Sequence, residues 1–254
     1  MTGYLEDRVV IVTGAGGGIG KGVALACASR GAAVVVATRG ENGREVAEEI
    51  AERGDQALWV RCDVTQRSEV ADLVQAAIGR YGHLDAIVHN ATSGLSSQPQ
   101  RLEDVDGAAL ADHSSVSLTG AFNCAIEAHT ALAERSGSLL VMTSPAGIEG
   151  SGTLPMYATM KGALRGFVKS LAREWGREGI TVNAVSPLGF SPAMVRAVEA
   201  DPAMETRLSN RVPMGRVGDP ETDVGVGVGF LLGPDARYIT GQTLGIDGGH
   251  FMSL

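Results

Sequence analysis

Short apolar runs alternate with longer amphipathic segments from one end of the chain to the other. Most of the short runs contain no polar alternation, which is typical of strands that are covered on both faces. They predict strands at residues 9–13, 33–37, 57–61, 86–88, 138–143, 181–185 and 243–246. The longer segments predict helices at residues 19–30, 42–53, 67–80, 106–134, 155–175 and 221–232. This alternation indicates an α/β fold, with a doubly wound parallel sheet and helical crossovers on both of its faces.

All 254 residues are predicted to form a single domain, because no linker, low-complexity tract or internal repeat interrupts the pattern. Residues 187–220 are the least regular part, with recurrent proline and few periodic signals. Long irregular segments in compact domains are often lids. We therefore expect this segment to be a mobile flap, or a set of short helices, that covers a substrate.

The composition excludes several classes of protein. Hydrophobic residues make up 44% of the chain and charged residues 20%, which is ordinary globular usage. The net charge is −8 with scattered basic residues, so we expect no nucleic-acid partner. No apolar run approaches the roughly 18 residues that span a bilayer, and the first residues lack the order of a secretory signal. Three cysteines without ligand spacing predict neither a disulfide framework nor a metal site, and a cytoplasmic location fits best.

A glycine-rich turn follows the first predicted strand and leads directly into a helix. The first N–H groups of a helix bind phosphate, and glycine lets a pyrophosphate approach the backbone closely. The spacing is G-x-x-x-G-x-G rather than the usual G-x-G-x-x-G. We predict a dinucleotide cradle here, and the alternative is a merely flexible turn. The candidate contacts are Gly14, Gly16, Gly17, Gly18, Ile19 and Gly20.

The end of the second predicted strand bears on the choice of cofactor. A dinucleotide site normally has an acidic residue there for the adenosine ribose, but none occurs between Asp7 and Glu41. The strand ends instead in Thr38 and Arg39, which offer a hydroxyl and a guanidinium to a 2′-phosphate. We therefore favour NADP(H) over NAD(H). The alternative is that Arg39 is a solvated surface charge and Glu41 binds a bare ribose.

Tyr157 and Lys161 are four residues apart in a predicted helix, so their side chains project from one face. An ammonium near a phenol favours the phenolate and lowers the tyrosine pKa, which suits proton transfer near neutral pH. Ser144 follows a predicted strand, at the edge of the sheet where open α/β folds bind ligands. Its hydroxyl could therefore bind the same substrate oxygen as Tyr157.

From Thr13 to Gly249 the sequence resembles the short-chain dehydrogenase/reductase family. The resemblance rests on several motifs in the right order rather than on one. Besides the glycine turn, these are Asp63-Val64, Asn90-Ala91, Ser144, Tyr157-Ala158-Thr159-Met160-Lys161, Val182-Asn183-Ala184 and Asp247-Gly248-Gly249.

This resemblance implies a single Rossmann-like domain that transfers a hydride between a nicotinamide and a carbonyl or alcohol. It further implies that Tyr157 is the general acid/base, that Ser144 orients the substrate oxygen, and that Lys161 binds the nicotinamide ribose. Asp63 and Val64 would flank the adenine. Asn90 and Ala91 would lie along the cofactor, and a homodimer or homotetramer built on the two longest helices would be expected.

Three departures from the family pattern affect particular expectations. Ser117 stands where the family has an asparagine that supports a proton relay, and serine is shorter. Thr92 replaces a glycine next to the cofactor. After Pro187 the usual glycine is delayed by Leu188, so the hydroxyl that meets the carboxamide would be that of Ser191.

These departures leave two functions open. The first is an NADP(H)-dependent carbonyl reductase or alcohol dehydrogenase acting on a small molecule such as a 3-oxoacyl thioester, ketone, steroid or polyol. The second is a non-catalytic cofactor-binding or structural member of the same fold with an incomplete catalytic tetrad. His89 is expected to be a hydrogen-bonded core histidine, with contact to substrate or relay as the alternative.

Overall fold

The protein was analysed as a computed structural model, which describes residues 3–201 and 203–252. Seven strands form one parallel sheet in the order β3-β2-β1-β4-β5-β6-β7. This confirms the predicted fold class and each predicted strand, with shifts of one or two residues at the ends. The strands are β1 Val9–Thr13, β2 Ala33–Thr38, β3 Ala57–Arg61, β4 Ala86–His89, β5 Ser138–Met142, β6 Thr181–Pro187 and β7 Thr243–Ile246.

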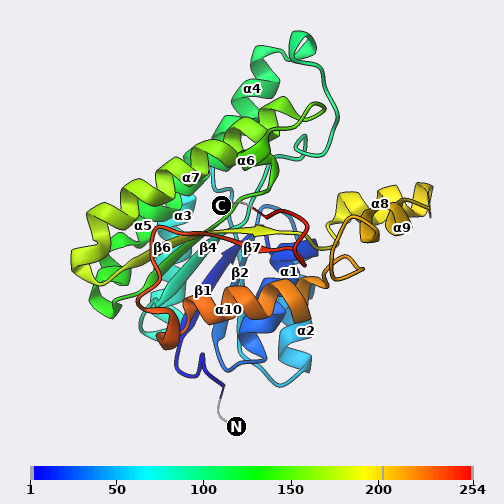
Figure 1. Cartoon of the computed structure of the whole chain (residues 1–254). Coiled ribbons are helices and arrows are strands. Elements are labelled where there is room, and N and C mark those ends of the chain that lie inside the picture. Colours follow the sequence, from blue (N-terminus) through cyan, green and yellow to red (C-terminus); the bar gives the residue numbers. More distant parts are fainter. Residues whose placement is uncertain (1–2, 202, 253–254) are drawn as a thin grey trace.

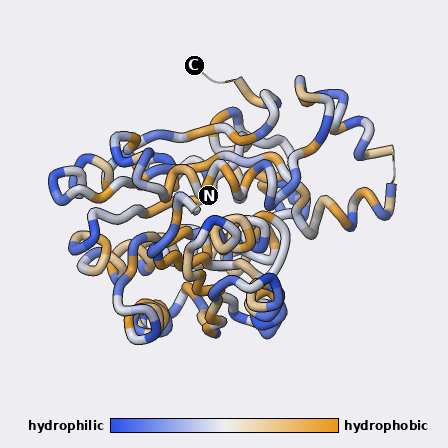
Figure 2. Tube along the Cα trace, turned by 90° about the horizontal axis from the view of Figure 1, so that it is seen from below, coloured by the Kyte–Doolittle hydropathy of each residue, from blue (hydrophilic) through white to orange (hydrophobic). Residues whose placement is uncertain are grey.

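Helices cover both faces of the sheet (Figure 1). On one face lie α3 (Arg67–Tyr81), α5 (Gly120–Arg135) and α7 (Pro155–Trp175), and on the other lie α1 (Gly18–Ala28), α2 (Asn42–Glu52) and α10 (Val226–Leu232). The shorter helices are α4 (Gly107–Ser114), α6 (Ala146–Glu149), α8 (Pro192–Ala200) and α9 (Ala203–Ser209). Apolar positions lie within these layers, whereas hydrophilic positions gather at loops and outer turns (Figure 2).

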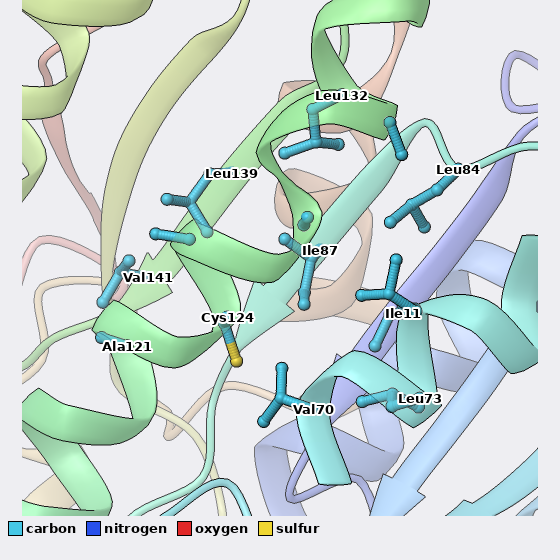
Figure 3. Packing of buried hydrophobic residues seen from close by; sticks show 14 of the residues in the cluster. Ile11, Val70, Leu73, Leu84, Ile87, Ala121, Cys124, Leu132, Leu139 and Val141 are labelled. Atoms are coloured by element: carbon cyan, nitrogen blue, oxygen red, sulfur yellow. The ribbon is translucent and has the colours of Figure 1, made fainter. Parts of the chain in front are cut away.

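The sheet has an apolar core on each side because successive side chains of a strand point to opposite faces. In β1, Val9 and Ile11 pack toward α3 and α5, while Val10 and Val12 pack toward α1. Figure 3 shows Ile11 close to Leu73, Leu84 and other buried side chains of the first cluster. A strand that is apolar at every position is therefore what this sheet requires.

The helix predicted at residues 106–134 is present as a continuous helical segment, but it is not α-helical throughout. Ser115–Thr119 form a π-helical turn between α4 and α5. Such turns are often found at functional sites. The turn contains Ser117, one of the predicted site residues.

Residues 187–220 contain the short helices α8 and α9, which project from the side of the molecule (Figure 1). This matches the expectation of short helices. Its role as a lid stays a prediction.

The strand order places a ligand crevice at one edge of the sheet. The chain winds from β1 to β2 and β3 on one side, and from β4 to β7 on the other. Open α/β sheets bind ligands outside the carboxyl ends of their strands at such a reversal point. The segments that follow β1, β4, β5 and β6 therefore meet at this edge. Among the described residues, no helix is both long and apolar enough to cross a membrane.

Candidate active site

The turn between β1 and α1 leaves no room for side chains at several glycines. Gly14 and Gly18 adopt positive φ angles of 64° and 51°, which favour glycine. A Cβ on Gly20 would lie 2.4 Å from the Asn90 amide nitrogen, and one on Gly16 would lie 2.0 Å from that of Asn42. Helix α1 has no side-chain N-cap among the described residues. The backbone at its start is therefore suited to an anionic group.

Asn90 and Ala91 hold this turn against the end of β4. The Asn90 amide nitrogen donates to the carbonyl oxygens of Thr13 at 3.1 Å and Gly14 at 3.0 Å. The Thr13 hydroxyl accepts the backbone N–H groups of Asn90 at 3.1 Å and Ala91 at 3.2 Å. Both residues thus shape the cradle through short hydrogen bonds.

At the end of β2, Thr38 and Arg39 behave differently from one another. The Thr38 hydroxyl donates to the Gly40 carbonyl at 2.7 Å and accepts from the Trp59 indole at 2.9 Å, so it is used inside the protein rather than offered to a ligand. Arg39 is exposed beside the cradle. The sequence did not single out Asn42, whose amide donates to the Gly16 carbonyl at 3.1 Å and links the two loops.

Asp63 and Val64 lie just past β3. The Asp63 carboxylate accepts the backbone N–H of Thr65 at 3.0 Å, and Asp63 donates its own N–H to Glu69 at 2.8 Å. The Val64 carbonyl accepts from the Asn123 amide of α5 at 2.8 Å. This turn is fixed by side chains from two helices, and Asn123 was not among the predicted residues.

Ser144, Tyr157 and Lys161 come together beyond the carboxyl end of β5. The Lys161 ammonium donates to the Met142 carbonyl at 2.7 Å and lies 5.6 Å from the centre of the Tyr157 ring. The Thr143 hydroxyl donates to the Lys161 carbonyl at 2.9 Å, which ties α7 to the strand. The Ser144 hydroxyl interacts with the Tyr157 phenol, so three of the four predicted catalytic side chains share one location, while the fourth, Ser117, lies in the π-helical turn.

Burial governs the proton affinities of this group. It lowers the pKa of Lys161, which is 4% exposed, to about 8. Burial also raises the pKa of Tyr157, and a hydrogen bond with the Ser144 hydroxyl partly opposes this. The expected lowering of the Tyr157 pKa by Lys161 is therefore not found, because burial dominates and the ammonium is turned toward Met142.

Ser117 is almost fully buried in the π-helical turn, and its carbonyl is bonded by His89. The His89 Nε2 lies 3.1 Å from this oxygen. Since a carbonyl can only accept, Nε2 carries the proton and Nδ1 faces the Thr13 hydroxyl at 3.5 Å. Burial and the Lys161 charge lower the pKa of His89 to about 3, so the ring is neutral. The core interpretation of His89 fits this geometry.

Pro187 ends β6, and the chain then turns toward α8. The Ser191 hydroxyl accepts the backbone N–H of Met194 at 3.2 Å and so caps that helix. The shifted register that the sequence suggested for Ser191 is compatible with this position.

A small pocket of about 10 Å³, with room for about one water molecule or one oxygen function, lies beside Tyr157. Its walls come from the loop after β4, the start of α7 and His113 of α4. Among the described residues, none of the segment 187–220 lines this pocket. That segment instead lines a second cavity together with β7. The sequence analysis missed His113, although its position four residues before Ser117 was an available signal.

Among the described residues, no group of three or more His, Cys, Asp or Glu side chains is arranged to hold a metal ion. The cysteines at positions 27, 62 and 124 are buried and unpaired with one another.

A phosphate cradle and a Ser–Tyr–Lys cluster at one edge of a seven-stranded parallel sheet define the class of this site. A family model described as enoyl-(acyl carrier protein) reductase matches residues 14–250. The chain is 34% identical to cis-4-hydroxycyclohexanecarboxylate dehydrogenase of Sinomonas cyclohexanicum, over 96% of each chain. It is also 34% identical to a 3-oxoacyl-[acyl-carrier-protein] reductase of Synechocystis sp., over 98% of each chain.

A solved structure supports the same assignment. The 3-ketoacyl-(acyl-carrier-protein) reductase of Brucella melitensis, crystallised with NADH, superimposes with a TM-score of 0.87 at 31% identity, covering 97% of this chain and 99% of that one. The protein belongs to the short-chain dehydrogenase/reductase family and is an oxidoreductase of that family.

Proposed function

We propose that the protein is an NADP(H)-dependent oxidoreductase that interconverts a carbonyl and an alcohol by hydride transfer. The observation that carries this proposal is the meeting of Ser144, Tyr157 and Lys161 beyond β5. A hydroxyl, a phenol and a buried ammonium in one place suit proton transfer to a carbonyl oxygen.

The residues at the cradle fit a dinucleotide. Gly14, Gly16 and Gly20 occupy points where a Cβ would collide with neighbouring backbone or amide groups. This close packing keeps the backbone accessible to a pyrophosphate. The same turn would involve Gly17, Gly18 and Ile19. Asp63 and Val64 would flank the adenine, and Asn90 and Ala91 would lie along the cofactor.

When bound, the nicotinamide would supply the hydride for reduction or accept it for oxidation. Tyr157 would donate its phenolic proton to the substrate oxygen during reduction, and Ser144 would donate a hydrogen bond to that same oxygen. Lys161 is positively charged below its pKa of about 8 and would bind the nicotinamide ribose, as the family resemblance implies. Ser117 would support the return of a proton from solvent, and Pro187 and Ser191 would border the carboxamide.

The geometry around Arg39 supports NADP(H) as the cofactor. Arg39 follows β2 and is exposed, so its guanidinium is free to pair with a 2′-phosphate. The competing residue for a bare ribose, Glu41, is occupied by Arg44, whose Nε donates to its carboxylate at 3.0 Å. Thr38 would act by holding the loop through Gly40 rather than by touching the phosphate.

The names of the relatives indicate which class of substrate to test. One relative is named for a hydroxycyclohexanecarboxylate and another for a 3-oxoacyl group. We propose a small carbonyl compound or its alcohol, with 3-oxoacyl thioesters and ketones as the candidates to screen.

We further propose a homodimer or homotetramer that uses α5 and α7. Phe122 and Ile126 of α5 are 50% and 47% exposed, and Phe122 stacks on Phe167 of α7 at 4.5 Å between ring centres. Light scattering of the purified protein would give its mass in solution.

The non-catalytic alternative draws on one observation. Ser117 stands where the family has an asparagine that supports the proton relay. The Ser117 carbonyl already accepts a hydrogen bond from His89. A protein of this kind would bind cofactor without turning over substrate.

The test is a fluorescence titration with NADPH and NADH, followed by NADPH oxidation assays with a panel of ketones and 3-oxoacyl thioesters. The proposal predicts tighter binding of NADPH and carbonyl-dependent oxidation. Tighter binding of NADH would overturn the cofactor assignment, and binding without oxidation of any carbonyl would favour the non-catalytic alternative.

A further inference from the structure

His113 is a buried side chain that no part of the proposed catalytic machinery uses. It lies near the end of α4, is 4% exposed, and lines the pocket beside Tyr157. No hydrogen bond or ion pair of its imidazole is found within residues 3–201 and 203–252. Buried polar groups in proteins nearly always have a hydrogen-bond partner. The nitrogens of His113 are not among the fully buried polar atoms that lack a partner, so they keep some access to solvent, and the ring lines the pocket.

The walls around His113 are anchored in place. The Asp112 carboxylate, adjacent in sequence, accepts the Ser93 hydroxyl, and Ser93 in turn accepts the backbone N–H of Leu95 at 3.0 Å. The Gln100 N–H donates to the Thr153 carbonyl at 3.0 Å, which joins the loop after β4 to the loop before α7. A pocket whose walls are fixed from several sides holds a polar group at a defined position. Little ordering of the pocket is then needed when a ligand binds.

The lining of this pocket is mixed. Leu95, Leu154 and Met156 supply apolar surface. The other polar side chains of the lining, Ser96, Gln98 and Gln100, are partly or fully exposed to water, whereas His113 supplies a buried polar group. An apolar pocket discriminates weakly against an added hydroxyl, but a pocket with a buried polar group disfavours ligands that leave this group unpaired. The arrangement therefore distinguishes substrates with a second polar group from plain hydrocarbon ketones.

We propose that His113 is a specificity-determining residue, which hydrogen-bonds a second oxygen function of the substrate while Tyr157 and Ser144 address the reacting oxygen. This inference rests on the proposed function and narrows its substrate class. The substrate is then a ketone or alcohol that carries a further hydroxyl, carbonyl or carboxylate oxygen on the side away from the cradle.

The test uses a pair of ketones that differ in one group, 4-hydroxycyclohexanone and 4-methylcyclohexanone. Both are neutral and close in size, so the comparison isolates the hydrogen bond. Steady-state rates are measured for the wild type and for His113→Phe, which keeps a ring but removes both nitrogens. The four values of KM form a cycle that reports the coupling between His113 and the substrate hydroxyl.

We expect His113→Phe to raise KM for the hydroxyketone about tenfold relative to the methylketone, with kcat changed less than about twofold. His113→Gln, which keeps an N–H donor, should restore most of this preference. Met156→Leu, a matched change in the same pocket, should affect both ketones equally. A coupling below about twofold overturns the proposal. Changes in kcat and KM that are equal for the two ketones overturn it as well.

Two further measurements keep the result decisive. If His113→Phe fails to fold, His113→Leu replaces it as the variant without a donor. Calorimetric binding of the same two ketones to the Tyr157→Phe variant with NADP⁺ reports the preference without turnover, because NADP⁺ cannot reduce a ketone and the variant lacks the base that oxidation of the hydroxyketone's secondary alcohol needs. Discrimination in binding without any turnover would contradict the proposed function but support the role of His113. Absence of discrimination in binding would overturn the role of His113 whatever the turnover.

Discussion

The cofactor region and the substrate region of the site are built in contrasting ways. The cofactor region, residues 13–20, 38–42, 63–64 and 90–91, is shaped mainly by backbone and by glycines that exclude side chains. The substrate region, residues 95–100, 113, 144 and 154–161, is shaped by side chains from three separate segments. Under the proposed function, the first region would bind a cofactor that is the same in every reaction, and the second would select the substrate.

Because of this difference, substitutions can alter cofactor binding and substrate turnover separately. Backbone recognition is insensitive to most substitutions but intolerant of an added Cβ. Side-chain recognition responds to single polar groups. Variants in the two regions should therefore change cofactor affinity and turnover independently.

The largest effect is expected in the substrate region, from Ser144→Ala. Removing the hydroxyl takes away a hydrogen bond to the developing charge on the substrate oxygen, which should lower kcat by about 10²–10³. It also removes the group that opposes the raised pKa of Tyr157. Steady-state kinetics with an active ketone measures this. Ser170→Ala, an exposed serine of α7, is the matched control and should leave kcat unchanged; an equal loss in both variants would contradict the assignment.

In the cofactor region, Gly20→Ala should weaken NADPH binding by at least about tenfold. Its Cβ would lie 2.4 Å from both the Asn90 amide and the Gly14 carbonyl, so the turn must shift. Fluorescence titration gives the affinity. The matched control is Gly79→Ala in α3, where nothing lies within 4 Å of the new Cβ. That change should leave affinity intact and raise the unfolding free energy by about 0.5–1 kcal/mol. Unaltered NADPH binding in Gly20→Ala would argue against the cradle.

A smaller effect is expected from Arg39→Ala, which should reduce the preference for NADPH over NADH by about tenfold or more. The reason is loss of the guanidinium that pairs with the 2′-phosphate, while NADH affinity should hardly change. Parallel titrations with both nucleotides measure the ratio, with Arg80→Ala on α3 as a remote control. An unchanged ratio would assign the phosphate to another residue.

The smallest effect concerns stability in acid and arises from His89. Its pKa is about 3 in the folded protein against 6.5 ordinarily, so between these values the unfolded chain binds the proton and the folded one does not. The His89 contribution is therefore present above about pH 6.5 and is lost as the pH falls toward 3. His89→Gln should flatten the fall in unfolding free energy by at most about 1.4 kcal/mol per pH unit. Denaturant unfolding at pH 7 and pH 5 measures the difference, and identical slopes would contradict it.

The sequence predicts the fold class and the strands well, because apolar runs that alternate with amphipathic segments require parallel strands joined by helical crossovers. Motif residues such as Tyr157 and Lys161 were also predictable, since four-residue spacing on a helix places them together. The internal use of the Thr38 hydroxyl was not predictable, because Trp59 reaches it from another strand. His113 and the π-helical turn were missed because pocket walls depend on loops distant in sequence and on a local change of helical pitch.

Measuring NADPH affinity and turnover on one preparation of Tyr157→Phe tests the central claim most directly. The phenyl ring preserves packing but cannot donate a proton. The variant therefore removes one oxygen atom from the substrate region and leaves the cofactor region unchanged. We predict NADPH binding within about twofold of the wild type and a loss of carbonyl-dependent NADPH oxidation of at least about a hundredfold. Turnover at the wild-type rate, or a collapse of NADPH binding that accounts for the lost activity, would contradict the account.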